Sequence, residues 1–245
     1  MKKLILSLFV LLFVISCGAT KPAPVQNDEA NQALLQKNES LAAELAEVKS
    51  VLGFVLQKGM NSSYEDAKKE IESVNKVHDL RISESPSTGD PNAKLVIVEF
   101  TEFQCPYCAR VAPTLDSIVR ANPGKIRLVY KHFPLSFHKD APAAAASAIA
   151  AGKQGKFWEY RWALAPNYSS LNDSTFVSIA EKVGLNIEQF KKDMVLDGEK
   201  LTIIDRDMKL GMDVGVQGTP NFYINGKRQD RFSPQLVEQL LKELY

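Results

Sequence analysis

The chain has 245 residues, of which 45% are hydrophobic and 24% charged, and its formal net charge is +1. This composition is that of an ordinary globular protein with enough residues for one or two domains. The small net charge excludes the broadly basic surface that nucleic-acid-binding proteins present to phosphates, so we expect no nucleic-acid partner. The three cysteines are few enough for each to be examined separately.

The N-terminus has the pattern of a bacterial lipoprotein signal. Two lysines precede an apolar run over Leu4–Ile15, and the run leads into a segment that resembles a lipobox ending at Cys17. A run of this length is shorter than the ~20 residues needed to span a bilayer. The pattern predicts a signal peptide over residues 1–16 and a lipid on the Cys17 sulfur that anchors the chain to a bacterial membrane, with its protein facing the periplasm. The alternative is an ordinary signal peptide or short anchor in which Cys17 has no role.

A heptad pattern follows a polar, proline-containing tether over residues 17–30. Its positions alternate spacings of four and three residues, which is the a/d pattern of a coiled coil. The pattern predicts a helical stalk over residues 31–59 and a homo-oligomer formed through residues 31–58. An amphipathic helix lying on its own domain is the alternative, and the number of strands stays open. The seam positions are Leu34, Asn38, Leu41, Leu45, Val48, Leu52 and Val55.

A helical linker is predicted over residues 60–84, because a helical period resumes between Tyr64 and Leu80. The segment Ser85–Pro91 is rich in serine, proline, glycine and aspartate, which indicates the boundary of a second domain over residues 85–245.

The second domain begins with a β-α-β pattern, continues with a block of helices and ends with a β-β-α pattern. The dipeptide Asn225-Gly226 predicts a hairpin between the last two strands. The expected strands are Leu95–Phe103, Ile126–Phe133, Phe222–Ile224 and Arg228–Arg231. The expected helices are Pro106–Ala121, Ala141–Ala151, Phe157–Ala165, Ser174–Val183, Ile187–Met194, Glu199–Met212 and Gln235–Leu244.

Cys105 and Cys108 lie three residues apart at the start of the first of these helices. We expect Cys105 to be the more exposed and to be the nucleophile, because unpaired N–H groups and the helix dipole favour its thiolate. Cys108, one turn further on, would be the resolving thiol. With Cys17 lipidated, an exported chain has no other thiol, which indicates redox chemistry rather than a structural disulfide.

Half of a zinc site is the alternative for the cysteine pair. Zinc takes about four ligands, and the sequence adds only three histidines to the two thiols. We therefore expect neither a metal nor another cofactor. His132 and His138 flank Phe133-Pro134, and each is expected at a core or surface position rather than as a residue that tunes the site.

The element order and four motifs together resemble the DsbA family of thiol–disulfide oxidoreductases. The resemblance covers about residues 85–245 and implies an α/β, thioredoxin-like fold with a helical insertion at about residues 138–213. The preceding stalk is more similar to the oligomeric isomerase relatives DsbC and ScsC. The motifs are Glu99–Cys108, Lys131–Leu135, Phe157-Trp158 and Gly218–Pro220.

The resemblance also implies roles for individual residues. Glu99 would lie buried under the disulfide and assist proton transfer as Cys108 attacks, the alternative being a side chain that reaches solvent at a strand end. Thr219 and Pro220 would form the family's cis-proline loop, whose backbone pairs with an extended substrate segment. Pro106 and Tyr107, which separate the cysteines, would also contact substrate.

The function that these features favour is thiol–disulfide exchange outside the cytoplasm. Its substrates would be unfolded or misfolded exported proteins, and a membrane redox partner would recycle the cysteine pair. An oxidase works as the disulfide, whereas an isomerase works as the dithiol and gains from an oligomer; the sequence leaves the two open. A non-catalytic surface lipoprotein that uses the fold for binding is a further alternative, and the presence of both cysteines argues against it.

Overall fold

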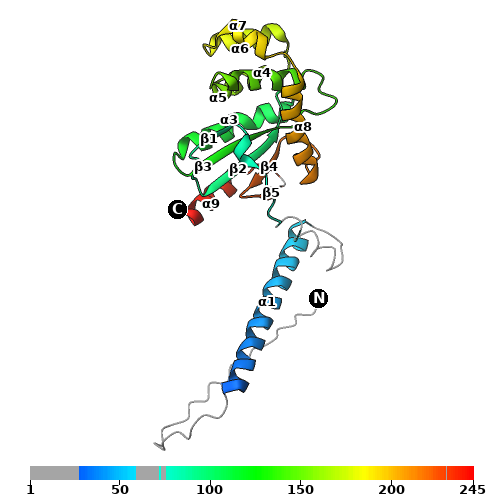
Figure 1. The fold of residues 1–245 in the computed structure, drawn as a ribbon. Helices are drawn as coiled ribbons and strands as arrows, with labels where there is room; N and C mark the ends of the chain where they lie inside the picture. The colour runs from blue at the N-terminus through cyan, green and yellow to red at the C-terminus, as the bar shows by residue number, and fades with distance from the viewer. Residues whose placement is uncertain (1–27, 59–71, 73–75, 230) are drawn as a thin grey trace, which may run out of the picture. The chain divides into compact units, whose positions relative to one another are not determined.

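The computed structural model describes residues 28–58, 72, 76–229 and 231–245 (Figure 1). The chain divides into two compact units, residues 1–64 and 65–245, which are considered separately below. The predicted signal peptide, Cys17 and most of the predicted linker lie outside the described residues. Among the helices that the structure describes, none is both long and apolar enough to cross a membrane.

In the first unit, the described chain forms one helix, α1, over Asp28–Lys58. Four seam side chains of α1 are about half exposed, with fractions between 48% and 56%. An apolar row exposed in this way has no partner within its own described helix. The coiled coil itself stays a prediction, and the Leu34 and Val55 side chains are outside the described ones. The exposed seam residues are Leu41, Leu45, Val48 and Leu52.

In the second unit, the strands of the described chain form one mixed sheet in the order β1-β3-β2-β4-β5. β2 and β3 are parallel and are connected through α3, whereas the other neighbouring pairs are antiparallel. The parallel register places Thr101 opposite His132, so both strands end at the same edge of the sheet. The strands are β1 Ser87–Gly89, β2 Leu95–Thr101, β3 Ile126–His132, β4 Asn221–Ile224 and β5 Lys227–Gln229.

Helices cover both faces of this sheet. α3, Pro106–Ala121, and α9, Pro234–Leu244, pack on one face together with alternate residues of β2 such as Ile97. α8, Gly198–Asp213, covers the other face, where Val98 points. Successive residues of a strand point to opposite faces, so an almost wholly apolar strand is expected only between two such layers.

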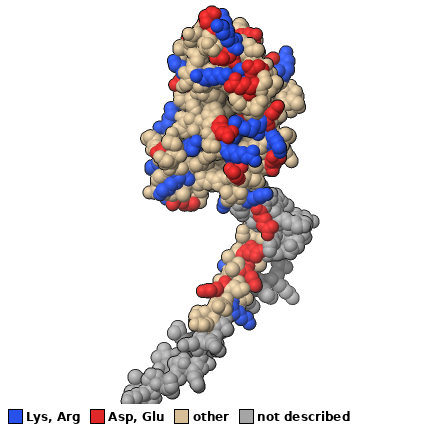
Figure 2. Space-filling view, in the orientation of Figure 1, with Lys and Arg blue, Asp and Glu red and all other residues tan. Residues whose placement is uncertain are grey.

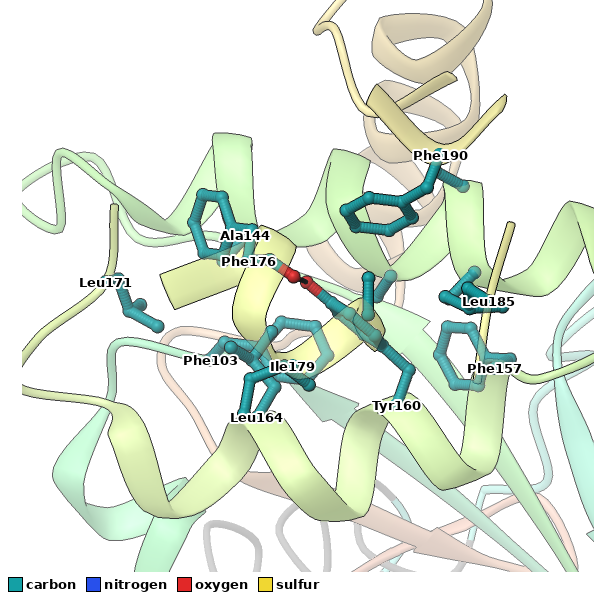
Figure 3. Packing of buried hydrophobic residues seen from close by; sticks show 14 of the residues in the cluster. Phe103, Ala144, Phe157, Tyr160, Leu164, Leu171, Phe176, Ile179, Leu185 and Phe190 are labelled. Atoms are coloured by element: carbon teal, nitrogen blue, oxygen red, sulfur yellow. Dashed lines mark hydrogen bonds between the residues drawn. The ribbon is translucent and has the colours of Figure 1, made fainter. Parts of the chain in front are cut away.

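The predicted helical insertion separates β3 from β4 and has its own hydrophobic core (Figure 3). Tyr160 and Phe190 lie at its centre with their rings 5.5 Å apart, and the Tyr160 hydroxyl donates to the Phe176 carbonyl oxygen. Phe157 and Tyr160 from one helix are both buried in this core, whereas Trp162 of the same helix is 36% exposed. Its helices are α4 Ala141–Lys153, α5 Phe157–Leu164, α6 Asp173–Lys182 and α7 Ile187–Asp193, with a short 3-10 turn η2 at Ala165–Asn167.

Near the start of the domain, one prediction is wrong and one strand was not predicted. The described residues from 76 to 80 are extended rather than helical, because Val77 bridges Lys227 and the His78 N–H donates to the Gly226 carbonyl oxygen at 2.9 Å. The boundary segment contains β1, which follows a 3-10 turn η1 over Ile82–Glu84. The sequence analysis does not predict this edge strand, because its residues include serine and glycine, which are typical of loops.

The surface of the domain is of mixed charge. On the face shown in Figure 2, acidic and basic side chains alternate over the folded domain instead of gathering into one patch of a single sign. This agrees with the formal net charge of +1.

Candidate active site

Cys105 lies where the chain leaves β2 and enters α3. It is the N-cap residue of the helix, in extended conformation with φ −75° and ψ 119°, and its Sγ accepts the Cys108 N–H at 3.5 Å. Pro106 occupies the first turn, where a missing N–H costs no hydrogen bond. The strand-to-helix junction therefore holds the two sulfurs on one helical turn.

Both cysteines are free thiols and are almost inaccessible, with exposed fractions of 2% for Cys105 and 3% for Cys108. The expectation that Cys105 is the more exposed is therefore wrong in this state. The loop after α8 covers Cys105, whose Sγ lies 3.4 Å from the Thr219 carbonyl oxygen.

The two thiols differ strongly in acidity. The pKa of Cys105 is lowered to about 5, first by the Cys108 thiol, which donates to the Cys105 sulfur, and further by the backbone N–H groups of Tyr107 and Cys108. Burial and the neighbouring Cys105 raise the pKa of Cys108. A stabilised thiolate at Cys105 and a protonated thiol at Cys108 agree with the predicted roles of nucleophile and resolving thiol.

The predicted substrate-binding residues lie around Cys105. The Thr219–Pro220 peptide bond is cis, as the resemblance implies, and the Thr219 carbonyl faces the sulfur. Pro106 is exposed, and Tyr107 is 63% exposed with the Arg110 guanidinium 5.4 Å from the centre of its ring. The buried Cys105 sulfur thus lies beside a backbone carbonyl, and exposed side chains follow it in the sequence.

Glu99 is fully buried, so the alternative of a solvent-reaching side chain is wrong. Its Oε2 accepts from Arg161 Nη2 at 2.9 Å, and Arg161 Nη1 also donates to Asp116 at 2.7 Å. Burial raises the pKa of Glu99, and the Arg161 charge opposes that rise. Its hydrogen-bonding partner is thus an arginine of the insertion rather than either cysteine. A small hollow lined by Arg161, Tyr130 and Cys108 lies nearby.

His138 lies at the site, contrary to expectation. Its Nδ1 contacts Oε1 of Glu102, a carboxylate that is also buried, three residues before Cys105. The sequence gives one signal for this pair, a second acidic residue in the strand-end motif, which the sequence analysis left unused. His132 is buried as predicted, and burial lowers its pKa to about 4.

No group of three or more metal-binding side chains is assembled among the described residues. The arrangement instead suits thiol chemistry: a stabilised thiolate, a second thiol within its reach and a backbone carbonyl beside them.

The thioredoxin family model matches residues 82–243, which cover the sheet, the insertion and the site. The chain therefore belongs to the thioredoxin family. The match spans most of the predicted second domain, and the resemblance to DsbA-type proteins with a helical insertion is confirmed at the level of the fold.

Solved structures with the same fold include a thioredoxin-like oxidoreductase from Silicibacter pomeroyi, 30% identical, with a TM-score of 0.57 over 70% of this chain and 95% of that one. A periplasmic thioredoxin-like protein from Salmonella enterica is 25% identical, with a TM-score of 0.57 over 71% and 94% of the two chains. ScsC from Proteus mirabilis is 20% identical, which shows the fold alone, with a TM-score of 0.56 over 91% and 97%.

Curated relatives include a Na(+)/H(+) antiporter from Mycobacterium sp. (strain KMS), 34% identical over 142 residues. The match covers 57% of this chain but only 23% of the antiporter. An antiporter from Mycolicibacterium gilvum is 37% identical over 143 residues, again 23% of its length. The chain thus spans about a quarter of these proteins, and their antiport activity is not carried over.

Proposed function

We propose that this protein is an extracytoplasmic thiol–disulfide oxidoreductase that forms or rearranges disulfides in exported proteins. The observation that carries the proposal is the acidity difference within the pair: the pKa of Cys105 is lowered to about 5, whereas burial raises that of Cys108. A structural pair of buried thiols needs no such difference in pKa. Disulfide exchange requires one thiolate that attacks and a second thiol that stays protonated until the mixed disulfide has formed.

The exchange proceeds in two displacements. The Cys105 thiolate attacks one sulfur of a substrate disulfide, a mixed disulfide forms, and the second substrate sulfur leaves as a thiolate. Cys108 then loses its proton and attacks the Cys105 sulfur, which releases the first substrate sulfur and leaves a Cys105–Cys108 disulfide. Two electrons have passed from the dithiol to the substrate, and oxidation of a substrate dithiol is the same sequence reversed.

The substrate's chain would lie along the Thr219–Pro220 loop as an added strand. The Thr219 carbonyl beside the Cys105 sulfur supports this, because main-chain pairing there would hold a substrate cysteine against the nucleophile. Such recognition depends little on side chains, so it suits many unfolded or misfolded proteins. The exposed Tyr107 ring would add apolar contact.

The direction of exchange follows from which form of the pair is the more stable. A thiolate held at a pKa of about 5 stabilises the reduced form, which makes the disulfide a ready oxidant. This favours an oxidase or an isomerase over a thioredoxin-like reductant. We propose a lipid on Cys17 as the anchor and a membrane protein as the redox partner; the periplasmic location named for the Salmonella relative supports an extracytoplasmic setting.

The test is reduction of insulin by dithiothreitol in the presence of the soluble chain from residue 18 onward. We expect the protein to accelerate insulin precipitation, and Cys105→Ser to abolish that acceleration. Reduced Cys108→Ser, mixed with insulin after dithiothreitol has been removed, should instead trap a mixed disulfide, because the attacking thiol remains and the resolving thiol is gone. Equal rates for the wild type and Cys105→Ser would contradict the proposed function and leave a binding module as the explanation.

A further inference from the structure

A groove with a volume of about 570 Å³ lies between the start of β1 and the helical insertion. Ligand sites in proteins have volumes of roughly 300–1,000 Å³, so this groove is large enough to hold a ligand. Its walls include residues 83–87, the end of α4, the start of α5 and the first turns of α8. Neither cysteine belongs to these walls, nor does Thr219 or Pro220, so the groove is separate from the site around Cys105.

Three residues that line this groove have buried polar atoms without a hydrogen-bonding partner among the described residues. Neither ring nitrogen of His132 has a partner, although the residue is only 1% exposed, and the same holds for Trp158 Nε1 and Ser85 Oγ. Burial lowers the pKa of His132 to about 4, so its ring is neutral and has one donor and one acceptor nitrogen. Because unpaired buried polar groups are costly, the groove favours a ligand that supplies both donors and acceptors.

The charged side chains that line the groove already have partners of opposite charge. Lys153 Nζ lies 2.6 Å from Glu199 Oε2, and Glu84 Oε2 lies 2.7 Å from Arg206 Nη1. A charged ligand would have to compete with these ion pairs, whereas an uncharged one would not. Apolar side chains from three helices make up much of the remaining lining, so the ligand should also have an apolar part. These side chains are Ile149 of α4, Phe157 and Trp158 of α5, and Ile203 of α8.

The backbone of one wall is free to pair with another strand. β1 is an edge strand of the described sheet and pairs with β3 alone. The Pro86 carbonyl oxygen accepts the Tyr130 N–H at 2.9 Å, so Pro86 directs its backbone toward β3. This direction alternates along an antiparallel strand, and Ser85 and Ser87 therefore direct their N–H and C=O groups away from β3. Because both serines also line the groove, a strand can be added at this wall.

We propose that the groove binds an extended, uncharged peptide segment as a strand added along residues 85–87. The backbone of such a segment supplies both donors and acceptors, and one of its apolar side chains packs against the apolar lining. The segment belongs to the exported protein on which Cys105 acts, a step that rests on the proposed function. The groove then holds one part of an unfolded chain while the cysteine site exchanges another, and the two contacts together keep the substrate bound for longer.

The experiment uses tryptophan fluorescence of the soluble chain from residue 18 onward. The chain has two tryptophans, so Trp162→Phe leaves Trp158 of the groove as the only one. A blocked hexapeptide of alternating threonine and valine, which has no cysteine, should change the Trp158 emission in a saturable way. Ile203→Asp places a charge in the apolar lining and should weaken this binding by about tenfold or more. Leu201→Asp is the matched control on the same helix, where an exposed leucine does not line the groove, and should bind as before.

Ser87→Pro removes an N–H that points away from β3 and leaves the pairing with β3 in place, so it tests strand addition directly. It should also weaken binding, and it decides the question alone if Ile203→Asp does not fold. An unchanged Trp158 emission, or equal affinities of Ile203→Asp and Leu201→Asp, would overturn the proposal.

N-acetylvaline amide, a single blocked residue, should bind far more weakly than the hexapeptide. Equal affinities of the two would overturn strand addition and indicate a site for a small molecule. Because neither probe contains sulfur, the measurements are independent of disulfide exchange. A failed insulin assay with intact peptide binding would contradict the proposed function, whereas active exchange without peptide binding would contradict only the groove's role.

Discussion

Cys105 shows how much of the chemistry depends on one residue's local bonds. Its thiolate is stabilised first by the Cys108 thiol and then by two N–H groups of the first turn of α3. The Cys108 thiol is the largest single cause of the lowered pKa. The spacing of three residues places the Cys108 thiol, a hydrogen-bond donor, next to the Cys105 sulfur. A single cysteine at a helix N-terminus has no such donor.

Replacing Cys108 with alanine should therefore raise the Cys105 pKa above its value of about 5. It should stay below ~8.5, the free-cysteine value, because the backbone N–H groups remain. Thiolate absorbance measured against pH gives the Cys105 pKa in each protein. The control Cys105→Ser keeps only the Cys108 thiol, whose pKa is raised, and should show no transition between these two values. An unchanged Cys105 pKa in Cys108→Ala would show that the thiol donor contributes nothing.

The lowered pKa also gives the reduced protein a pH-dependent stability. The pKa of Cys105 is lower in the folded state than in the unfolded state. The stabilisation of the fold by its thiolate is therefore fully present above ~8.5, the pKa in the unfolded state. It is lost as pH falls toward about 5. The difference in free energy of unfolding between the reduced wild type and Cys105→Ser should shrink over that interval, in the same titration series.

At the scale of elements, Arg161 connects three parts of the domain. It projects from α5 of the insertion and binds Glu99 of β2 and Asp116 of α3, all of them buried. Its guanidinium also lies 5.3 Å from the centre of the Trp158 ring. One cation thus compensates two buried carboxylates and fixes the insertion to the strand and helix that carry the cysteines.

Replacing Arg161 with alanine should reduce the free energy of unfolding by about 3–5 kcal/mol, because two buried carboxylates lose their counter-charge. Denaturant unfolding of the oxidised protein measures the change. Arg120→Ala removes an exposed arginine that contacts the Trp162 ring and is the matched control, for which a loss below about 1 kcal/mol is expected. Equal losses for the two variants would show that the Arg161 network adds no stability of its own.

The sequence predicts well the helices and turns that are determined by neighbouring residues in the chain. Asn186 and Ser233 cap α7 and α9, with side-chain oxygens that accept the N–H groups of Gln189 and Leu236. The hairpin at Asn225-Gly226 likewise follows from a dipeptide that tolerates positive φ, and both residues adopt it. The cysteine pair belongs to this class, because a strand followed by a helix places it without any distant contact.

Distant contacts could not be predicted in the same way. Arg161 is 62 residues from Glu99 in sequence, and His138 is 36 from Glu102. Hydrophobic periodicity carries no information about which buried charges meet. Gly211 is a further case, since a Cβ there would lie 2.6 Å from the Phe133 ring, a close approach that only the packing of α8 reveals.

At the scale of the whole molecule, we propose that the two units have separate tasks. The second unit contains both cysteines and the Thr219 carbonyl beside them. An exposed apolar row on a helix of 31 residues is what a parallel coiled coil buries against copies of itself. We propose that the stalk joins several domains, so that one can hold a misfolded chain while another exchanges its disulfides.

The last prediction concerns this stalk. Changing Leu45 and Leu52 to aspartate should convert the soluble protein from an oligomer to a monomer, because the charges fall on the predicted seam. Ala43→Asp with Ser50→Asp adds the same charges to the outer face of the heptad and should leave the oligomer intact. Light scattering reports the state of each variant.

The seam variant should also lose most refolding of scrambled ribonuclease, whereas its oxidation of dithiols persists, because Cys105 and Cys108 are untouched. Isomerisation requires repeated capture and release of one chain, for which several linked sites raise the effective concentration of the nucleophile. A wild-type monomer would rule out the oligomer altogether. An oligomer whose isomerase activity matches that of the seam variant would assign the stalk to another task and favour an oxidase.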